Sequence, residues 1–223
     1  RHSSARSSCT PSCDYAGFAQ IEWEKPHPAC IALFWAGCGG DQNPLPRRTV
    51  ELARQYGNEL ATAVNNALAD APTAVDGKLA TTFAEIDLPL AKLPSREELA
   101  RDAKSANKYV AARAKHWLAE MENGKSISPS YPYPVQTWSL GGVQIIFLSG
   151  EVVVDYAVRL KAELGDDTTG GTNVWVAGYS NDVMAYIPSR RVLTEGGYEG
   201  GGAMIYYGLP TTWSPQVEEV IVR

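Results

Sequence analysis

The stretch Val143-Gln-Ile-Ile-Phe-Leu148, followed at once by Ser149-Gly-Glu151, decides how this chain folds. Its apolar residues predict a buried strand, and the three residues after it predict a polar turn. Beyond the turn, Val154, Val158 and Leu160 mark the apolar side of a helix. A strand that passes through a polar loop into a helix is the repeating unit of α/β proteins, so this stretch predicts an α/β fold.

The same order is predicted earlier in the chain. Ala29-Cys-Ile-Ala-Leu-Phe-Trp-Ala36 has the apolar and aromatic content of a buried strand, and the turn residues of Gly37–Pro44 follow it. Thr49 is placed to cap a helix. The apolar positions of that helix recur every four residues, at Leu52, Tyr56, Leu60, Val64 and Leu68.

The order begins a third time at Val174-Trp-Val-Ala177, which leads into the polar segment Tyr179–Gly202. Strands alternating with helices favour a mixed or parallel sheet flanked by helices. In such sheets ligands collect at the carboxyl ends of the strands, where all three polar loops are expected. We therefore expect the functional residues in these loops.

The domain organisation follows from composition along the chain. Residues 1–13 are polar and rich in serine, without the apolar run of a secretory signal, and are interpreted as a flexible lead-in. Residues 14–223 are predicted to form a single α/β domain. Within it, residues from about 71 to 125 are predicted to form a helical lobe that covers the sheet, with one charged helix from about Ser95 to Asn123.

Bulk properties exclude several functions. The chain has 223 residues, of which 44% are hydrophobic and 20% charged, enough to bury a sizeable core. Its net charge of -5 argues against nucleic acid as a partner, because phosphates attract a basic surface. No apolar run approaches the roughly 20 residues of a membrane span. The sequence thus predicts a soluble protein, shows no signal peptide, and leaves the cellular compartment and oligomeric state open.

The cysteines do not define a metal site. Cys9 and Cys13 have loosely metal-like spacing but lack a matching second pair, and Cys30 and Cys38 follow separately. Unpaired or locally bridged thiols are the expected state, so the redox compartment stays open.

Candidate site residues lie in the three polar loops, and each has a structural alternative. Glu151 stands at the start of a helix, where a carboxylate is a catalytic group, a ligand or a cap. Asp41 is a catalytic candidate or a residue that shapes its turn. Tyr186 and Tyr198 are site phenols or half-buried aromatic residues with satisfied hydroxyls.

Histidine motifs give no independent indication of a metal. His27 lies in a proline-flanked loop and His116 in the predicted charged helix, without a second histidine at helical spacing. The sequence also lacks a nucleophile elbow, a phosphate loop and a dinucleotide fingerprint. Several common enzyme classes are therefore excluded.

Four blocks of the sequence, taken in order, resemble the neutral, non-lysosomal ceramidase family, in particular its shorter bacterial members that lack an appended immunoglobulin-like domain. The blocks are Asp14–Gln20, Phe34–Pro44, Leu148–Glu151 and Asn181–Glu199. Each block alone is a weak signal, but the ordered set is specific. It spans most of residues 14 to 222 and resembles the back half of a ceramidase catalytic domain.

The resemblance implies a zinc amidohydrolase that cleaves the N-acyl bond of a lipid-like substrate. By position, Glu151 and Tyr186 are similar to two zinc ligands of the family, and Tyr198 to a tyrosine near the scissile carbonyl that donates to the developing oxyanion. Tyr179 and Asn181 are expected to contact the substrate. The implied mechanism is attack by a zinc-activated water on the carbonyl.

The chain also departs from the family pattern. The family's two zinc histidines lie ahead of the block that matches Asp14–Gln20, where this chain has Ser7-Ser-Cys-Thr-Pro-Ser-Cys13, and His2 is the nearest histidine. The family serine of a Gly-Asp-x-Ser-Pro motif is replaced by Asn43, whose amide cannot act as a nucleophile. Whether Cys9, Cys13 or His27 replaces the histidines is left open.

Three functions are consistent with this pattern. The chain is an amidohydrolase or esterase with a rebuilt site, a folded fragment that binds zinc weakly, or a non-enzymatic module that binds an acyl chain. Because the retained residues are those of the site, the hydrolase is the preferred hypothesis.

Overall fold

The computed structural model describes residues 14–70, 72–165 and 173–223. The described residues form two compact units: unit 1 comprises those within 14–35 and 43–74, and unit 2 those within 36–42 and 75–223. The organisation of 14–223 as one domain stays a prediction. The predicted lead-in over residues 1–13 lies outside the described residues.

Unit 1 is a pair of packed helices, α1 (Tyr15–Glu24) and α2 (Val50–Ala69). The predicted start of α2 is confirmed, since the Thr49 hydroxyl accepts a hydrogen bond from the Leu52 amide at 3.2 Å. The helices approach closely at Gly57, where an added Cβ would lie 2.5 Å from the Phe18 Cβ. Only glycine fits this contact without displacing α1.

The strand predicted over Ala29–Ala36 is wrong. No strand forms there, and Ile31 is 83% exposed. Side chains of α1 satisfy the backbone instead: the Gln20 amide donates to the Ala32 carbonyl at 2.9 Å, and the Glu24 carboxylate accepts from the Ala32 amide at 3.0 Å. An apolar segment does not need to pair as a strand when side chains already satisfy its backbone hydrogen-bonding groups.

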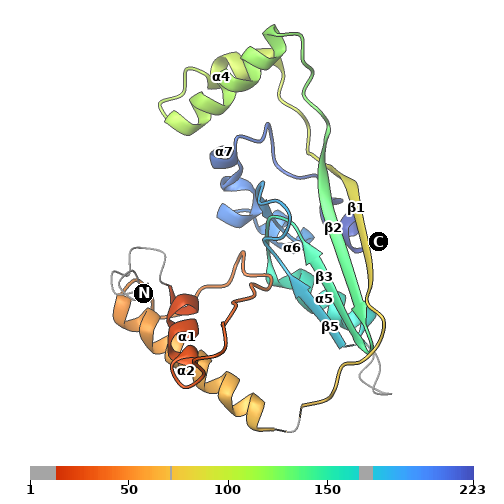
Figure 1. The fold of residues 1–223 in the computed structure, drawn as a ribbon. Helices are drawn as coiled ribbons and strands as arrows, with labels where there is room; N and C mark the ends of the chain where they lie inside the picture. Colours follow the sequence, from red (N-terminus) through yellow and green to blue (C-terminus); the bar gives the residue numbers. More distant parts are fainter. Residues whose placement is uncertain (1–13, 71, 166–172) are drawn as a thin grey trace. The chain divides into compact units, whose positions relative to one another are not determined.

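Unit 2 is built on a mixed sheet in the order β1-β2-β3-β5. Strands β1 (Ala80–Pro89), β2 (Ser130–Leu140) and β3 (Val143–Leu148) are antiparallel neighbours, and β5 (Asn173–Ala177) runs parallel to β3 (Figure 1). The predicted strands at β3 and β5 are confirmed. With helices flanking this mixed sheet, the predicted α/β class is confirmed as well.

Helix α5 (Val154–Leu164) connects β3 to β5, as predicted, and packs against β5. Its buried side chains Tyr156 and Leu160 join the core with alternate residues of the sheet. Those sheet residues are Ile146, Leu148, Val174 and Val176. The alternation that places these residues on one face also leaves Trp175 on the other, exposed face of β5.

The segment predicted as a helical lobe is more varied than expected. It contains strand β1, which the sequence analysis missed, and its predicted single helix is two helices, α3 (Arg96–Asp102) and α4 (Lys108–Glu122). The break arises at Asn107, whose side chain accepts hydrogen bonds from the Tyr109 and Val110 amides and so starts a new helix.

The remaining elements lie mostly after β5. They are β4 (Glu151–Val152), β6 (Tyr186–Ile187), α6 (Arg190–Glu195), the π-helical turn η1 (Tyr198–Gly202), α7 (Met204–Tyr207) and α8 (Val217–Val222). Strands β4 and β6 form a separate parallel pair. In the described parts of the chain, no helix combines the length and apolar character needed to cross a membrane.

Asp155 of α5 joins that helix to the start of α6. Its carboxylate accepts a hydrogen bond from the buried Ser189 hydroxyl at 2.5 Å and two from the Arg191 guanidinium at 3.1 Å. The hydrogen bond from Arg191 is the largest effect and lowers the pKa of Asp155 below its ordinary value by stabilising the charged form. Burial opposes it, and the hydrogen bond from Ser189 lowers the pKa further.

In Gly57→Ala the new methyl group overpacks the helix contact, which typically costs about 1–3 kcal/mol. Alanine gains roughly 1 kcal/mol over glycine in a helix, so the substitution is expected to destabilise unit 1 by up to about 2 kcal/mol. Urea unfolding followed by circular dichroism measures the change. The control Asn66→Ala, at an exposed position of the same helix, is expected to be neutral or slightly stabilising; equal effects of the two substitutions would contradict the packing argument.

Asp155→Asn is expected to lower the free energy of unfolding at neutral pH, and this loss should shrink on acidification. The folded-state pKa of Asp155 is depressed, so its contribution is fully present above the ordinary aspartate value of about 3.9 and declines as the pH falls from there through the lower folded-state pKa. Urea unfolding at about pH 7, 5 and 3 tests this. A gap between wild type and variant that does not change with pH, or that equals the gap for exposed Asp70→Asn, would refute the linkage.

Candidate active site

Strands β4 and β6 bring two predicted site residues together. Their parallel register pairs Glu151 with Tyr186 and Val152 with Ile187. The valine and isoleucine are buried in the core, whereas Glu151 and Tyr186 are half-buried. A carboxylate and a phenol, 35 positions apart in the sequence, are thereby placed side by side where a ligand can reach them.

The turn before Glu151 requires glycine. Gly150 has a φ of 77°, and an added Cβ would lie 2.6 Å from the Ile187 side chain and 2.7 Å from the Ala185 carbonyl. The Gly150 amide donates to the Asp182 carbonyl at 2.7 Å, and the Glu151 amide donates to the Ala185 carbonyl at 2.8 Å. The main chain at Glu151 is therefore fixed against the segment that leads into β6.

Buried side chains also hold this turn. The Ser149 hydroxyl lies 2.9 Å from the Pro134 carbonyl oxygen and 2.7 Å from that of Ser180, within hydrogen-bonding distance of both. The Tyr133 hydroxyl donates to the Ser149 carbonyl at 2.7 Å. Both Ser149 and Tyr133 are fully buried, so these hydrogen bonds are shielded from water.

Tyr207 also belongs to the site, although no sequence motif indicates it. Its hydroxyl donates a short hydrogen bond to the Glu151 carboxylate, and its ring centre lies 6.3 Å from that of Tyr186. The residue sits in Met204-Ile-Tyr-Tyr207, whose composition is typical of a core helix. The sequence offers one indication, namely that a partly buried glutamate needs a hydrogen-bond donor. It does not specify which tyrosine is that donor.

Both phenols next to Glu151 have raised pKa values. Burial is the largest cause for Tyr186 and for Tyr207, followed by hydrogen bonding to Glu151 and by the negative charge of that carboxylate. Since each effect disfavours a phenolate, both hydroxyls stay protonated at neutral pH and act as hydrogen-bond donors.

Tyr198 opens the π-helical turn η1 and packs edge-on against Tyr186, with ring centres 5.4 Å apart. It is 49% exposed, so part of this residue is accessible to a ligand. The structure thus brings the predicted residues Glu151, Tyr186 and Tyr198 into one cluster, and Tyr207 completes it.

Asp41 has a structural position close to this cluster. Its carboxylate accepts a hydrogen bond from the Val154 amide, the first residue of α5, at 2.8 Å. The neighbouring Gly40 amide donates to the Val152 carbonyl at 2.9 Å, and a Cβ on Gly40 would lie 2.5 Å from the Glu151 carbonyl oxygen. Asp41 therefore caps α5 from a distant loop, and its predicted catalytic role stays a prediction.

The two residues expected to contact substrate differ in position. Tyr179 and Asn181 both have a left-handed backbone, with φ of 56° and 65°. The Tyr179 amide donates to the Gly150 carbonyl at 3.0 Å, which places this residue at the turn before Glu151. Asn181 is exposed, and its amide group donates to the Gln136 side chain at 3.4 Å.

The donors in the described residues do not by themselves fit a zinc site. Glu151 and Tyr186 supply two oxygen donors, but no group of three His, Cys, Asp or Glu side chains suited to a metal occurs in the described residues. His27 stacks on Trp23 in unit 1, with ring centres 4.1 Å apart, and His116 packs against its own neighbour on α4. His2, Cys9 and Cys13 lie outside the described residues.

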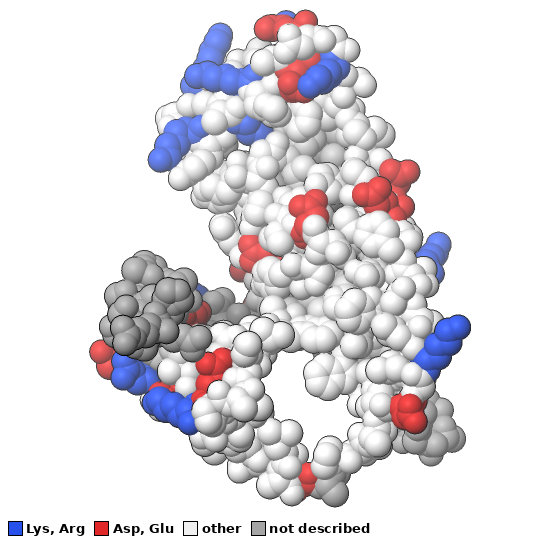
Figure 2. Space-filling model, in the orientation of Figure 1, with Lys and Arg blue, Asp and Glu red and all other residues white. Residues whose placement is uncertain are grey.

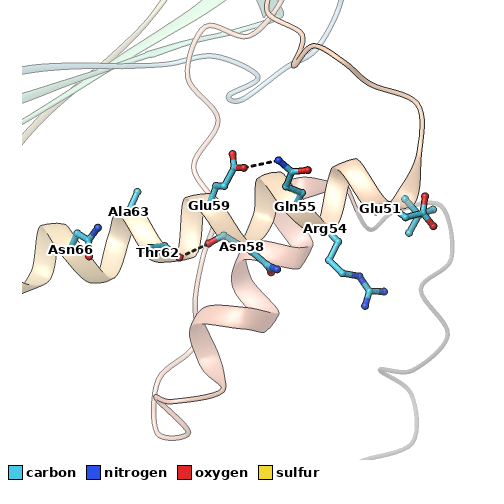
Figure 3. Close-up of a pocket in the computed structure, with 9 residues that line it drawn as sticks. Glu51, Arg54, Gln55, Asn58, Glu59, Thr62, Ala63 and Asn66 are labelled. Atoms are coloured by element: carbon cyan, nitrogen blue, oxygen red, sulfur yellow. Dashed lines mark hydrogen bonds between the residues drawn. The ribbon is translucent and has the colours of Figure 1, made fainter.

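A groove of about 880 Å³ runs along α2 in unit 1 and contains none of the predicted site residues. Figure 3 shows its polar side chains bonded along the helix, Gln55 to Glu59 at 2.9 Å and Thr62 to the Asn58 carbonyl at 2.8 Å. Its lining is typical of a solvated helix face. The chemistry of the cluster at Glu151, rather than the size of this groove, identifies the candidate site.

Solved structures of ceramidases share this fold. The neutral ceramidase from Pseudomonas aeruginosa matches 92% of the chain with a TM-score of 0.57 and 18% identity. A structure described as a ceramidase complexed with C2 matches 94% of it with a TM-score of 0.61 and 15% identity. The chain spans 38% and 41% of those two chains. No family model and no curated protein sequence matches the chain. The resemblance proposed from the sequence is confirmed in the fold.

Asp41→Ala is expected to lower the free energy of unfolding by about 0.5–2 kcal/mol, the usual cost of removing a helix cap. Asp41→Asn keeps an oxygen acceptor for the Val154 amide and should recover most of that loss. Urea unfolding of the three proteins makes the comparison. Equal losses in the alanine and asparagine variants would show that the capping hydrogen bond does not account for the effect.

Proposed function

We propose that unit 2 carries the glutamate–tyrosine part of a hydrolase site that cleaves an acyl amide or ester bond of a lipid-like substrate, in the manner of a ceramidase. The observation that carries the proposal is the β4–β6 register, which places Glu151 beside Tyr186. The ring of Tyr186 in turn packs against the exposed Tyr198. The shared fold supports it, because the residues retained from the resemblance converge at one place.

The proposed roles follow from protonation and position. Tyr198 is the exposed phenol and donates to the oxygen of the scissile carbonyl as negative charge develops there. Tyr207 hydrogen-bonds the Glu151 carboxylate and fixes its orientation. Tyr186 is kept protonated by burial and by Glu151, and its ring packs edge-on against the Tyr198 ring and so positions it. Tyr179 is proposed to contact the substrate from the same turn, with Asn181 farther out.

The proposal includes zinc because ceramidases, which the chain resembles, are expected to be zinc enzymes. A bound zinc ion would polarise the substrate carbonyl and supply an activated water. Glu151 and Tyr186 are its proposed ligands, and a complete site requires nitrogen or sulfur donors from beyond the described residues. The proposed roles of Tyr198 and Tyr207 do not depend on the metal.

Tyr198→Phe is expected to reduce kcat by roughly 100-fold to 1,000-fold, the usual effect of removing one oxyanion donor, with little change in KM. Hydrolysis of a fluorogenic N-acyl amide and of the matching ester by the full chain, with and without added zinc, measures this. Glu151→Gln should abolish the same activity.

Tyr206→Phe is the matched control, because it removes the hydroxyl of an exposed tyrosine of the same aromatic cluster while keeping the ring that packs near Tyr198. It is expected to retain nearly full activity. Binding of either substrate without turnover by the wild-type chain would favour an acyl-chain binding module instead. Turnover unaffected by Tyr198→Phe would refute the proposed role of that phenol.

A further inference from the structure

The α3–α4 segment is basic although the chain is acidic. Residues 92–125 contain eight Lys and Arg against five Asp and Glu, whereas the whole chain contains 20 against 25. Figure 2 shows Lys and Arg side chains gathered over the end of unit 2 that carries α4. Such a local excess of one sign attracts a partner of the opposite sign.

Part of this charge is not neutralised within the fold. Three of the basic residues form ion pairs in the same segment: Arg96 with Glu122, Arg113 with Asp102, and Lys125 with Glu120. Five others are exposed and form no ion pair with a described residue: Lys92, Arg101, Lys104, Lys108 and Lys115. The last four, which lie on α3, on α4 and in the connection between them, are termed the basic patch. On α4, Lys108 and Lys115 are two turns apart and share one side of the helix.

Two exposed tyrosines, Tyr109 and Tyr206, connect the basic patch to the candidate site and are termed the tyrosine rim. Lys108 lies over the Tyr109 ring at 4.9 Å, and Tyr109 packs edge-on against Tyr206 at 4.7 Å. Tyr206 in turn lies 6.1 Å from Tyr198 between ring centres. Tyr109 and Tyr206 are 43% and 51% exposed, so an apolar and hydroxyl-bearing surface runs from α4 to the proposed oxyanion donor.

The α4 helix is anchored to the segment that carries the site. The Trp117 indole donates to the Gly208 carbonyl at 2.8 Å, directly after α7. Helices α4 and α7 also pack against each other. The basic patch and Tyr198 are therefore held in a fixed relation within unit 2.

We propose that the basic patch and the tyrosine rim form a docking surface for an anionic lipid bilayer, which delivers lipid-like substrate to Tyr198. The proposal rests on the proposed function for the identity of the substrate, but not for the binding itself. Lysine and arginine each add favourable energy near an anionic leaflet. Tyrosine is the aromatic residue that, with tryptophan, settles at the boundary between headgroups and acyl chains.

A bilayer fits this surface better than another polyanion does. The four charges lie on two helices and their connection rather than along a single groove, and the adjoining surface is phenolic. A nucleic acid would require basic side chains that follow a backbone of phosphates, and the chain as a whole is acidic. An interface that combines cations with exposed tyrosines matches headgroups above acyl chains.

The test compares two variants with the same net charge. The patch variant carries Arg101→Gln, Lys104→Gln, Lys108→Gln and Lys115→Gln. The control variant carries Arg48→Gln, Lys78→Gln, Lys161→Gln and Arg190→Gln, at exposed positions elsewhere. Each removes four positive charges and takes the formal net charge from -5 to -9. Circular dichroism and thermal melting establish that both are folded.

Cosedimentation of the full chain with vesicles gives the readout. Wild type is expected to bind vesicles of phosphatidylcholine with about 30% phosphatidylserine, but not phosphatidylcholine alone. The patch variant should bind the anionic vesicles roughly 100-fold more weakly, and the control variant within about threefold of wild type. Tyr109→Ser in the wild-type background should also weaken binding, by a few-fold, since the rim loses one ring.

Equal losses in the patch and control variants would overturn the proposal, as would equal binding of wild type to neutral and anionic vesicles. Binding to a DNA duplex as tight as to the anionic vesicles would also overturn it. Anionic vesicle binding that depends on the patch, in a chain that hydrolyses neither amide nor ester, would support the docking surface while refuting the proposed hydrolase.

Discussion

The position of Glu151 depends on the fully buried hydroxyl of Ser149. This hydroxyl meets the carbonyls of Pro134 on β2 and Ser180 after β5, while Tyr133 binds the serine carbonyl. One residue therefore ties three segments of unit 2 to each other. A buried polar group left without a partner costs about 1–3 kcal/mol, so the turn after β3 has one favourable arrangement and Glu151 emerges from it in one direction.

A second constraint acts from the loop over residues 36–42. Gly40 and Gly150 both bring backbone so close to the chain around Glu151 that a side chain at either place would collide with main-chain atoms. Asp41 then binds the first amide of α5, so the loop, the short strand β4 and the helix are fixed together. The backbone of Glu151 is thereby held by two segments of the chain, and its side chain contacts the phenol of Tyr207.

The sequence predicted those elements whose signals are local. Val143–Leu148 is a continuous apolar run and α2 has strict helical spacing, and both were confirmed. Ala29–Ala36 carries the same apolar signal, but side chains of α1 satisfy the backbone at Ala32, which no local pattern reveals. Strand β1 was missed because an edge strand with exposed residues lacks the alternation of a half-buried one.

In the candidate site, too, some residues could be predicted from the sequence and others depend on contacts between distant parts of the chain. Glu151, Tyr186 and Tyr198 were found through a resemblance that preserves their order along the chain, and the structure brings them together. Tyr207 was missed because its role depends on a hydrogen bond across 56 positions of the sequence. Asp41 stands out in a sequence as a carboxylate among glycines, but its contact with α5, 113 positions away, is visible only in the fold.

The arrangement around Glu151 also limits what this carboxylate can do. Two phenols kept protonated by burial and by its charge donate toward it, so the charge is stabilised without a cation in the described residues. A carboxylate has two oxygens with about four acceptor positions, and Tyr207 occupies one position on one oxygen. The remaining acceptor positions are left for Tyr186, which also hydrogen-bonds Glu151, and for a cation or a substrate donor. The phenols orient the carboxylate before any ligand arrives, which reduces the reorganisation that ligand binding and catalysis would otherwise require.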